Sequence, residues 1–179
     1  MKIESKRFGM LEVMEDCILL LNGGLLGFSH MTRFVLVDEQ EDPNLPLKWL
    51  ISVDDPEYGF LVTDPGIFFK DYVFDLSEDD RREIGASTED DITVISMLTI
   101  PADPRRITAN LRGPLVFNNR TMTGKQIILE NTGYATKHYI FIQTADTEAA
   151  TVAKASAAVP AAKIVGAGDT TNTDVKTHA

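Results

Sequence analysis

Hydrophobic and polar residues alternate along much of the chain with a period close to two, the spacing of side chains on one face of a β-strand. Short runs of β-branched and aromatic residues are separated by polar or proline-containing loops. These runs predict strands over residues 34–38, 49–52, 58–63 and 92–100. Further runs predict strands over 3–8, 18–21, 107–111, 115–118 and 126–130, with a hairpin turn at 121–124.

The alternation also extends over residues 71–76. Tyr72, Phe74 and Leu76 fall on one face of this segment, while Asp71 and Asp75 fall on the other. We therefore expect a strand here, with one apolar face and one face that carries two carboxylates.

One helix interrupts the series of strands. Ser77 precedes three acidic residues, which places a capping hydroxyl and acids at a helix N-terminus, and Gly85 ends the helix. Residues 134–141 fit either a second short helix or a final strand. Many short strands at close spacing favour a sandwich or a small barrel over alternating βαβ units. We expect an all-β fold, a small closed or partly open β-barrel-like domain with one or two short helices.

The last 36 residues differ from the rest of the chain. All 14 aromatic residues lie between Phe8 and Phe141, and Ala and Thr make up half of residues 144–179. Such a segment buries too little apolar area to offset the entropy of ordering it. We expect a folded domain over 1–143 and a flexible tail over 144–179, with at most a short helix over 147–158.

The net charge of −10 is concentrated in one part of the chain. Residues 38–91 hold 17 acidic and 4 basic side chains. This excess disfavours direct binding of nucleic acid and matches either a basic protein partner or a solvated acidic face. No apolar run is long enough to span a membrane, and the first residues do not resemble a signal peptide, so we expect a cytoplasmic protein.

Side chains that could carry chemistry are sparse. The single cysteine excludes an internal disulfide, and the three histidines show no metal-ligand spacing. Asp54 and Asp55 precede Pro56, which is typical of a turn in which carboxylates cap backbone amides. We predict no catalytic residue, metal or cofactor. The alternative is a small β-barrel ligand-binding module or a carboxylate-dependent enzyme that uses Asp54, Asp55 and His138.

Seven fragments occur in an order that is informative. They are GLLGF (24–28), WLISVDDP (49–56), FLVTDP (60–65), DYVFDL (71–76), LTIP (98–101), ITANLRGPLVFN (107–118) and YATKHYIF (134–141). This succession resembles the FliW family of flagellar assembly factors over about residues 1–142. Residues beyond 143 lie outside the resemblance.

The resemblance implies a non-enzymatic β-barrel protein that works by choosing partners. Proteins of this family bind flagellin before its export and also bind the translational repressor CsrA, which then releases flagellin mRNA. We expect the acidic segment to attract the basic repressor and the apolar surface around Tyr72 and Phe74 to receive flagellin. The residues expected at partner contacts are Asp54, Asp55, Glu57, Asp71, Tyr72, Phe74, Asp75, Asn110 and Asn118.

Overall fold

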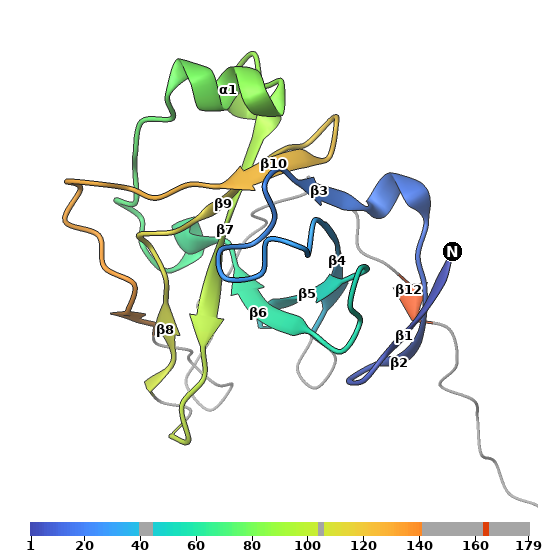
Figure 1. Cartoon of the computed structure of the whole chain (residues 1–179). Coiled ribbons are helices and arrows are strands. Elements are labelled where there is room, and N and C mark those ends of the chain that lie inside the picture. The colour runs from blue at the N-terminus through green and yellow to red at the C-terminus, as the bar shows by residue number, and fades with distance from the viewer. Residues whose placement is uncertain (40–44, 104–105, 141–162, 165–179) are drawn as a thin grey trace, which may run out of the picture.

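Strands account for most of the regular structure, as the alternating pattern predicts (Figure 1). The computed structural model describes residues 1–39, 45–103, 106–140 and 163–164. Its strands are β1 (Lys2–Ser5), β2 (Gly9–Glu12), β3 (Leu19–Leu21), β4 (Arg33–Asp38), β5 (Lys48–Ser52), β6 (Gly59–Thr63), β7 (Ile92–Thr99), β8 (Thr108–Ala109), β9 (Leu115–Asn118), β10 (Thr123–Gln126), β11 (His138–Tyr139) and β12 (Lys163–Ile164). Its helical elements are α1 (Glu78–Ile84) and the 3₁₀ turns η1 (Glu15–Cys17), η2 (Pro65–Ile67) and η3 (Glu89–Asp91).

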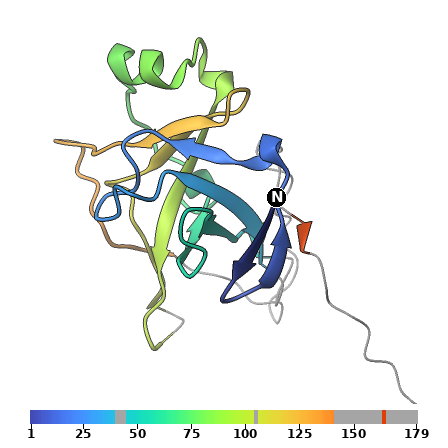
Figure 2. The same cartoon turned by 45° about the vertical axis from the view of Figure 1, so that its right-hand side comes forward.

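Within the described residues, seven strands close into a barrel because β7 pairs with β6 on one side and with β9 on the other. The closed order is β9, β10, β3, β4, β5, β6 and β7. Every pairing is antiparallel except that of β10 with β3 (Figures 1 and 2). The prediction of an all-β, barrel-like domain is confirmed.

The barrel interior is filled by the inward-facing residues of these strands and of the loop between β3 and β4. Alternation puts every second side chain inside, so the core is apolar although the strands are short. The buried members of this core are Leu19, Leu21, Leu25, Met31, Phe34, Leu36, Leu50, Val62, Ile95, Leu115, Phe117 and Met122.

The hairpin of β1 and β2 covers a second core outside the barrel. Ile3 and Leu11 pack there against Val35 and Val37 of β4 and against Ile51 of β5. The predicted strand over 3–8 is therefore shorter than expected, and β2 was missed. β12, which belongs to the predicted tail, pairs antiparallel with β2. The predicted helix over 147–158 lies outside the described residues.

Two short strands extend the sheet beyond the barrel. β8 pairs with the end of β7, and β11 pairs with β8. Within 134–140, the part of that range that the structure describes, His138–Tyr139 form a two-residue strand and there is no helix. The predicted strand over 107–111 is reduced to two residues. Leu111 and Ile140 are buried in a third core beside these strands.

The helix α1 begins and ends where the sequence predicts. The Ser77 hydroxyl accepts a hydrogen bond from the amide of Asp80, and Gly85 takes the left-handed conformation at φ 69°. In the part of the chain that the structure describes, no helix is long and apolar enough to cross a membrane.

The predicted strand over 71–76 is wrong, although its two faces are as expected. Tyr72, Phe74 and Leu76 turn towards a core, while Val73 is 75% exposed. Among the described residues the segment pairs with no strand: the Val73 amide donates to the Tyr134 hydroxyl instead. Alternation specifies which face is buried, but pairing needs a neighbouring strand edge, and this segment crosses the outside of the barrel.

After β9, the turn and the following strand lie earlier in the chain than predicted. The turn lies at 119–122, with Met122 at φ 57°, and β10 begins at Thr123. Beyond Gln126 the predicted strand over 126–130 is irregular. Ile127 and Leu129 donate backbone hydrogen bonds to the carbonyls of Pro114 and Arg112, outside the regular ladder.

Candidate functional site

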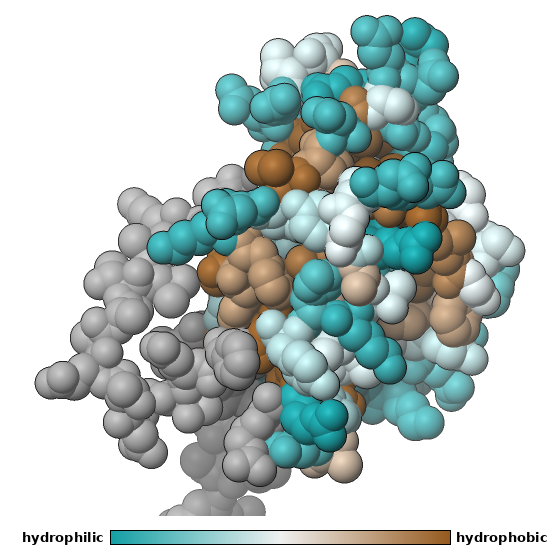
Figure 3. Space-filling model, turned by 90° about the vertical axis from the view of Figure 1, so that its left-hand side faces the viewer, coloured by the Kyte–Doolittle hydropathy of each residue, from teal (hydrophilic) through white to brown (hydrophobic). Residues whose placement is uncertain are grey.

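A groove of about 670 Å³ lies on the outside of the barrel, beside α1. Its floor is formed by Ile92, Thr93 and Val94 of β7 and by Val116 of β9. The remaining lining residues come from η2, the 72–76 segment, α1, η3 and the turn after β9: Asp64, Pro65, Gly66, Tyr72, Val73, Phe74, Asp75, Leu76, Arg81, Glu89, Asp90 and Asn119. This volume falls within the usual range of ligand sites. Figure 3 shows hydrophobic surface recessed among hydrophilic groups on the face that lies to the left in Figure 1.

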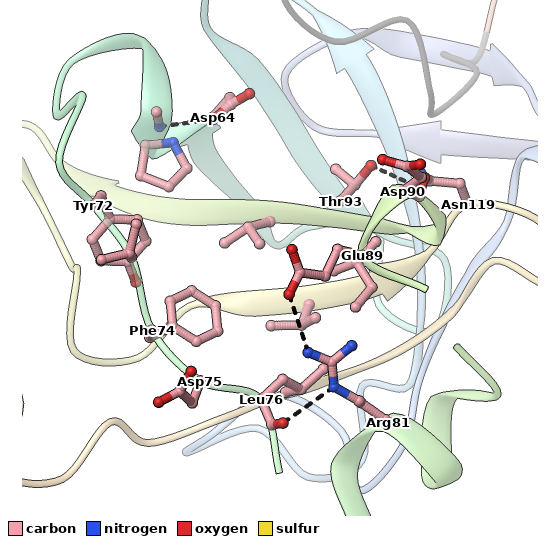
Figure 4. A pocket seen from close by; sticks show the side chains of 16 residues that line it. Asp64, Tyr72, Phe74, Asp75, Leu76, Arg81, Glu89, Asp90, Thr93 and Asn119 are labelled. Carbon is pink, nitrogen blue, oxygen red and sulfur yellow. Dashed lines mark hydrogen bonds and ion pairs between the residues drawn. The ribbon is translucent and has the colours of Figure 1, made fainter. Parts of the chain in front are cut away.

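Tyr72 and Phe74 form an aromatic wall of the groove (Figure 4). Their ring centroids are 5.5 Å apart and the planes are tilted by 57°. The Tyr72 hydroxyl donates to the carbonyl of Leu111 at 2.8 Å, and its ring packs against Tyr134. Burial, together with Tyr134, raises the pKa of Tyr72 well above its usual value. Tyr72 is therefore a neutral side chain held in place by a hydrogen bond and by ring packing.

An ion pair joins the two sides of the groove at α1 and η3. The Arg81 guanidinium lies 3.6 Å from the Glu89 carboxylate, and Arg81 Nε also donates to the carbonyl of Leu76 at 3.3 Å. The Arg81 side chain is 30% exposed and the Glu89 side chain 88% exposed. Glu89 thus presents its carboxylate to solvent at the edge of an apolar floor.

Three further carboxylates line the groove. Asp64 accepts a hydrogen bond from the Gly66 amide at 2.8 Å and caps η2. Among the described residues, no basic side chain forms an ion pair with Asp64, Asp75 or Asp90. Counting the residues that the structure describes, the groove therefore carries four carboxylates against the single guanidinium of Arg81.

Lys125 of β10 ties α1 to the barrel and so positions Arg81. Its ammonium lies 2.7 Å from Asp80 and 2.6 Å from Glu83. The hydrogen bond from Lys125, with that from Ser77, lowers the pKa of Asp80, and the two carboxylates raise the pKa of Lys125. The helix that carries one side of the groove is thus anchored by charge as well as by packing.

Asp54, Asp55 and Glu57, which the sequence predicts at partner contacts, lie in the turn between β5 and β6 and do not line the groove. Asp54 accepts from the amides of Thr32 and Arg33 and pairs with the Arg33 guanidinium at 2.6 Å. Desolvation raises the pKa of Asp54, but these hydrogen bonds outweigh it and hold the pKa below its usual value. Asp54 therefore fastens two loops together. Asp55 accepts weakly from the Glu57 amide, and Glu57 is exposed.

Asn110 and Asn118, the two asparagines predicted at partner contacts, both form hydrogen bonds within the fold. Asn110 accepts from the Gly113 amide at 2.9 Å, within a turn. Asn118 is fully buried, and its amide group donates to the carbonyls of Ile84 and Gly85 at the end of α1. Its side chain thus faces the helix rather than the surface.

His138 is not assembled with the carboxylates of the enzyme alternative. Its Nε2 accepts from the Ala135 amide at 2.8 Å, and its ring packs against Phe69 and Tyr134. Asp54 is engaged by Arg33 in a different part of the barrel. Across the described ranges there is no cluster of three or more His, Cys, Asp or Glu side chains that could hold a metal ion.

The structure brings together only part of the predicted set. Tyr72, Phe74 and Asp75 line the groove, and Asp71 lies exposed at the start of the same segment. The sequence reasoning missed Arg81 and Glu89 as a pair. The helix cap at Ser77 and the excess of acid over residues 38–91 were visible, but no local signal shows that Arg81 and Glu89 line the same groove as Tyr72.

The family model described as "FliW protein" matches residues 2–140. The chain belongs to the FliW family. A flagellar assembly factor FliW from Geobacter sulfurreducens is 38% identical over 162 residues, which is 90% of this chain and 100% of that protein. A flagellar assembly factor FliW from Clostridium beijerinckii is 38% identical over 137 residues, 76% of this chain and 96% of that protein.

A solved FliW structure supports the same assignment. The crystal structure of the flagellar assembly factor FliW matches with a TM-score of 0.73 and 34% identity, covering 80% of this chain and 99% of that one. The chain is thus a flagellar assembly factor of the FliW family. The Geobacter alignment is longer than the 143 residues of the predicted domain, so it includes part of the segment that follows.

Proposed function

We propose that this FliW-family protein is a non-catalytic, cytoplasmic partner-switching factor that binds flagellin and antagonises the translational repressor CsrA. When flagellin is exported, the freed protein captures the repressor, and flagellin mRNA is released for translation. The observation that carries the proposal is the meeting of aromatic and acidic side chains at one groove, where Tyr72 and Phe74 stand beside Asp75 and Glu89.

An apolar groove suits flagellin as a client. A helical segment that is partly unfolded before assembly exposes apolar side chains, and such segments dock in grooves through regularly spaced anchors. Ile92 and Val94 on the floor, with the wall of Tyr72 and Phe74, supply that apolar surface.

The acidic rim suits the repressor. A protein that binds RNA is basic, and complementary charge accelerates its encounter with an acidic surface. Because the acids and the aromatic wall belong to the same groove, we propose that the two partners exclude each other there. Mutual exclusion is what a switch between partners requires.

Reversing the two acids of the 71–75 segment tests this assignment. We expect D71K/D75K to slow association with the repressor about tenfold at low salt, with a smaller effect on flagellin. Both aspartates are exposed, so each substitution costs less than about 0.5 kcal/mol of stability. The matched control is E4K/E12K, which makes the same charge change on exposed positions of β1 and β2.

The measurement is the association rate of each purified partner at two ionic strengths, followed by competition of flagellin against bound repressor. Repressor binding that is insensitive to salt and to D71K/D75K would refute the acidic surface. Simultaneous binding of both partners would refute mutual exclusion. An equal effect of E4K/E12K would show that only net charge matters.

A further inference from the structure

The ion pair between Arg81 and Glu89 lies where a cation from another protein can reach the Glu89 carboxylate. It lies at the edge of the groove with the atoms 3.6 Å apart, and its carboxylate is 88% exposed. Exposed pairs at this separation contribute little to stability, because water screens the charges and both side chains lose freedom. A second cation could therefore replace Arg81 at Glu89 with little loss to the fold.

The rest of the groove fits the side chain that would make this exchange. Among the described residues, four carboxylates line it and only Arg81 opposes them, so a positive charge is favoured inside. Ile92 and Val94, both half-buried, offer an apolar floor for an aliphatic stem. Tyr72 and Phe74 line the groove, and aromatic rings attract a guanidinium or ammonium group.

We propose that the groove is an anchor pocket for one arginine or lysine side chain of a protein partner, which displaces Arg81 from Glu89 on binding. This inference rests on the proposed function, since it assigns the anchor to the basic partner, the repressor. Arg81 forms an ion pair with Glu89 in the unbound protein and competes with the partner's cation for that carboxylate.

The inference predicts effects of opposite sign for the two members of one ion pair. Glu89→Gln removes the negative charge that holds the cation and should weaken repressor binding about five- to tenfold. Arg81→Met keeps an apolar stem but removes the competitor, so it should strengthen binding about two- to fivefold. In the double variant the gain from Arg81→Met should vanish, because Arg81 acts through Glu89.

Neighbouring residues of α1 provide matched controls. Arg82→Met removes the same charge one residue along, from a side chain that is 75% exposed and pairs with Asp79. Glu78→Gln makes the same chemical change as Glu89→Gln at an exposed position. Neither Arg82 nor Glu78 lines the groove, so both variants should bind the repressor within about twofold of the wild-type protein.

The experiment is a titration of each full-length variant with purified repressor and, separately, with purified flagellin. Thermal unfolding of each variant verifies that α1 stays in place when Arg81 no longer donates to Leu76. Weaker binding by both Arg81→Met and Glu89→Gln would overturn the exchange, since it would mean that the pair merely supports the groove. A gain from Arg82→Met equal to that from Arg81→Met would overturn it as well.

The remaining outcomes separate this inference from the proposed function. If the wild-type protein fails to bind the repressor, the proposed function fails and the anchor assignment fails with it. If the wild-type protein binds but Glu89→Gln has no effect, only the anchor is refuted. If the opposite signs occur with flagellin and not with the repressor, the assigned occupant is wrong.

Discussion

Replacing Asn118 by alanine tests how the helix that carries Arg81 is held over the barrel. The Asn118 amide donates to the carbonyls of Ile84 at 3.1 Å and Gly85 at 2.9 Å. Its oxygen accepts from the amides of Arg120 at 2.9 Å and Thr121 at 3.4 Å. The side chain is 0% exposed, so these four hydrogen bonds join β9, the following turn and the C-terminus of α1 inside the protein.

The expected loss is about 4 kcal/mol of unfolding free energy. The bond to Ile84 is fully buried, and leaving its carbonyl without a donor costs about 1–3 kcal/mol. The other three bonds are partly buried and contribute about 0.5–1 kcal/mol each, because water can reach the groups left behind. For a domain of this size, such a loss lowers the midpoint of thermal unfolding by about 10 °C.

The isosteric variant N118D adds a dependence on pH. One carboxyl oxygen would keep the two amide donors, while the other would face the carbonyls of Ile84 and Gly85. Burial and these carbonyls favour the protonated form, so the pKa of the new carboxyl in the folded state lies above its unfolded value. The folded state then binds more protons, and stability relative to wild type falls as the pH rises through that pKa.

Chemical denaturation of wild type, N118A and N118D at about pH 4 and about pH 7 makes the comparison. We expect N118D to lose stability relative to wild type at the higher pH and to regain part of it at the lower one. An N118A protein as stable as wild type, or an N118D deficit independent of pH, would refute the role assigned to these hydrogen bonds.

The remaining predictions concern the core, an anchoring loop and the C-terminal segment. Leu111→Ala should cost about 2–5 kcal/mol, because Leu111 is 1% exposed in a packed cluster; unchanged denaturation would contradict this. Asp54→Asn should lower stability near neutral pH and matter less in acid. The pKa of Asp54 in the folded state lies below its value in the unfolded state, so the carboxylate stabilises the fold above the unfolded-state pKa, and this contribution is lost as the pH falls through the folded-state pKa. An equal loss of stability at both pH values would argue against this role. Deleting 144–179 should leave folding and partner binding intact while reducing hydrogen-exchange protection of β2, which pairs with Lys163–Ile164; aggregation or loss of a partner would show a larger role.

Much of the local structure was predictable because it depends on neighbours in sequence. The barrel strands follow from period-two alternation, and α1 follows from Ser77 and Gly85 at its ends. Even where the strand over 71–76 is absent, its pattern correctly placed Tyr72 and Phe74 on the inner face. A side-chain pattern reports which face is buried, whatever partner covers it.

The closure of the barrel and the groove depend on contacts that no local pattern encodes. β7 must pair with both β6 and β9, and Gly124 is needed because a Cβ there would lie 2.3 Å from the Phe117 ring. Arg81 and Glu89 are selected as groove residues only when α1 and η3 are set against β7. The sequence by itself therefore determined the faces of the elements and the excess of acid. The tertiary structure decided which acids meet the aromatic wall, because long-range strand pairing and packing bring together residues that are far apart in the chain.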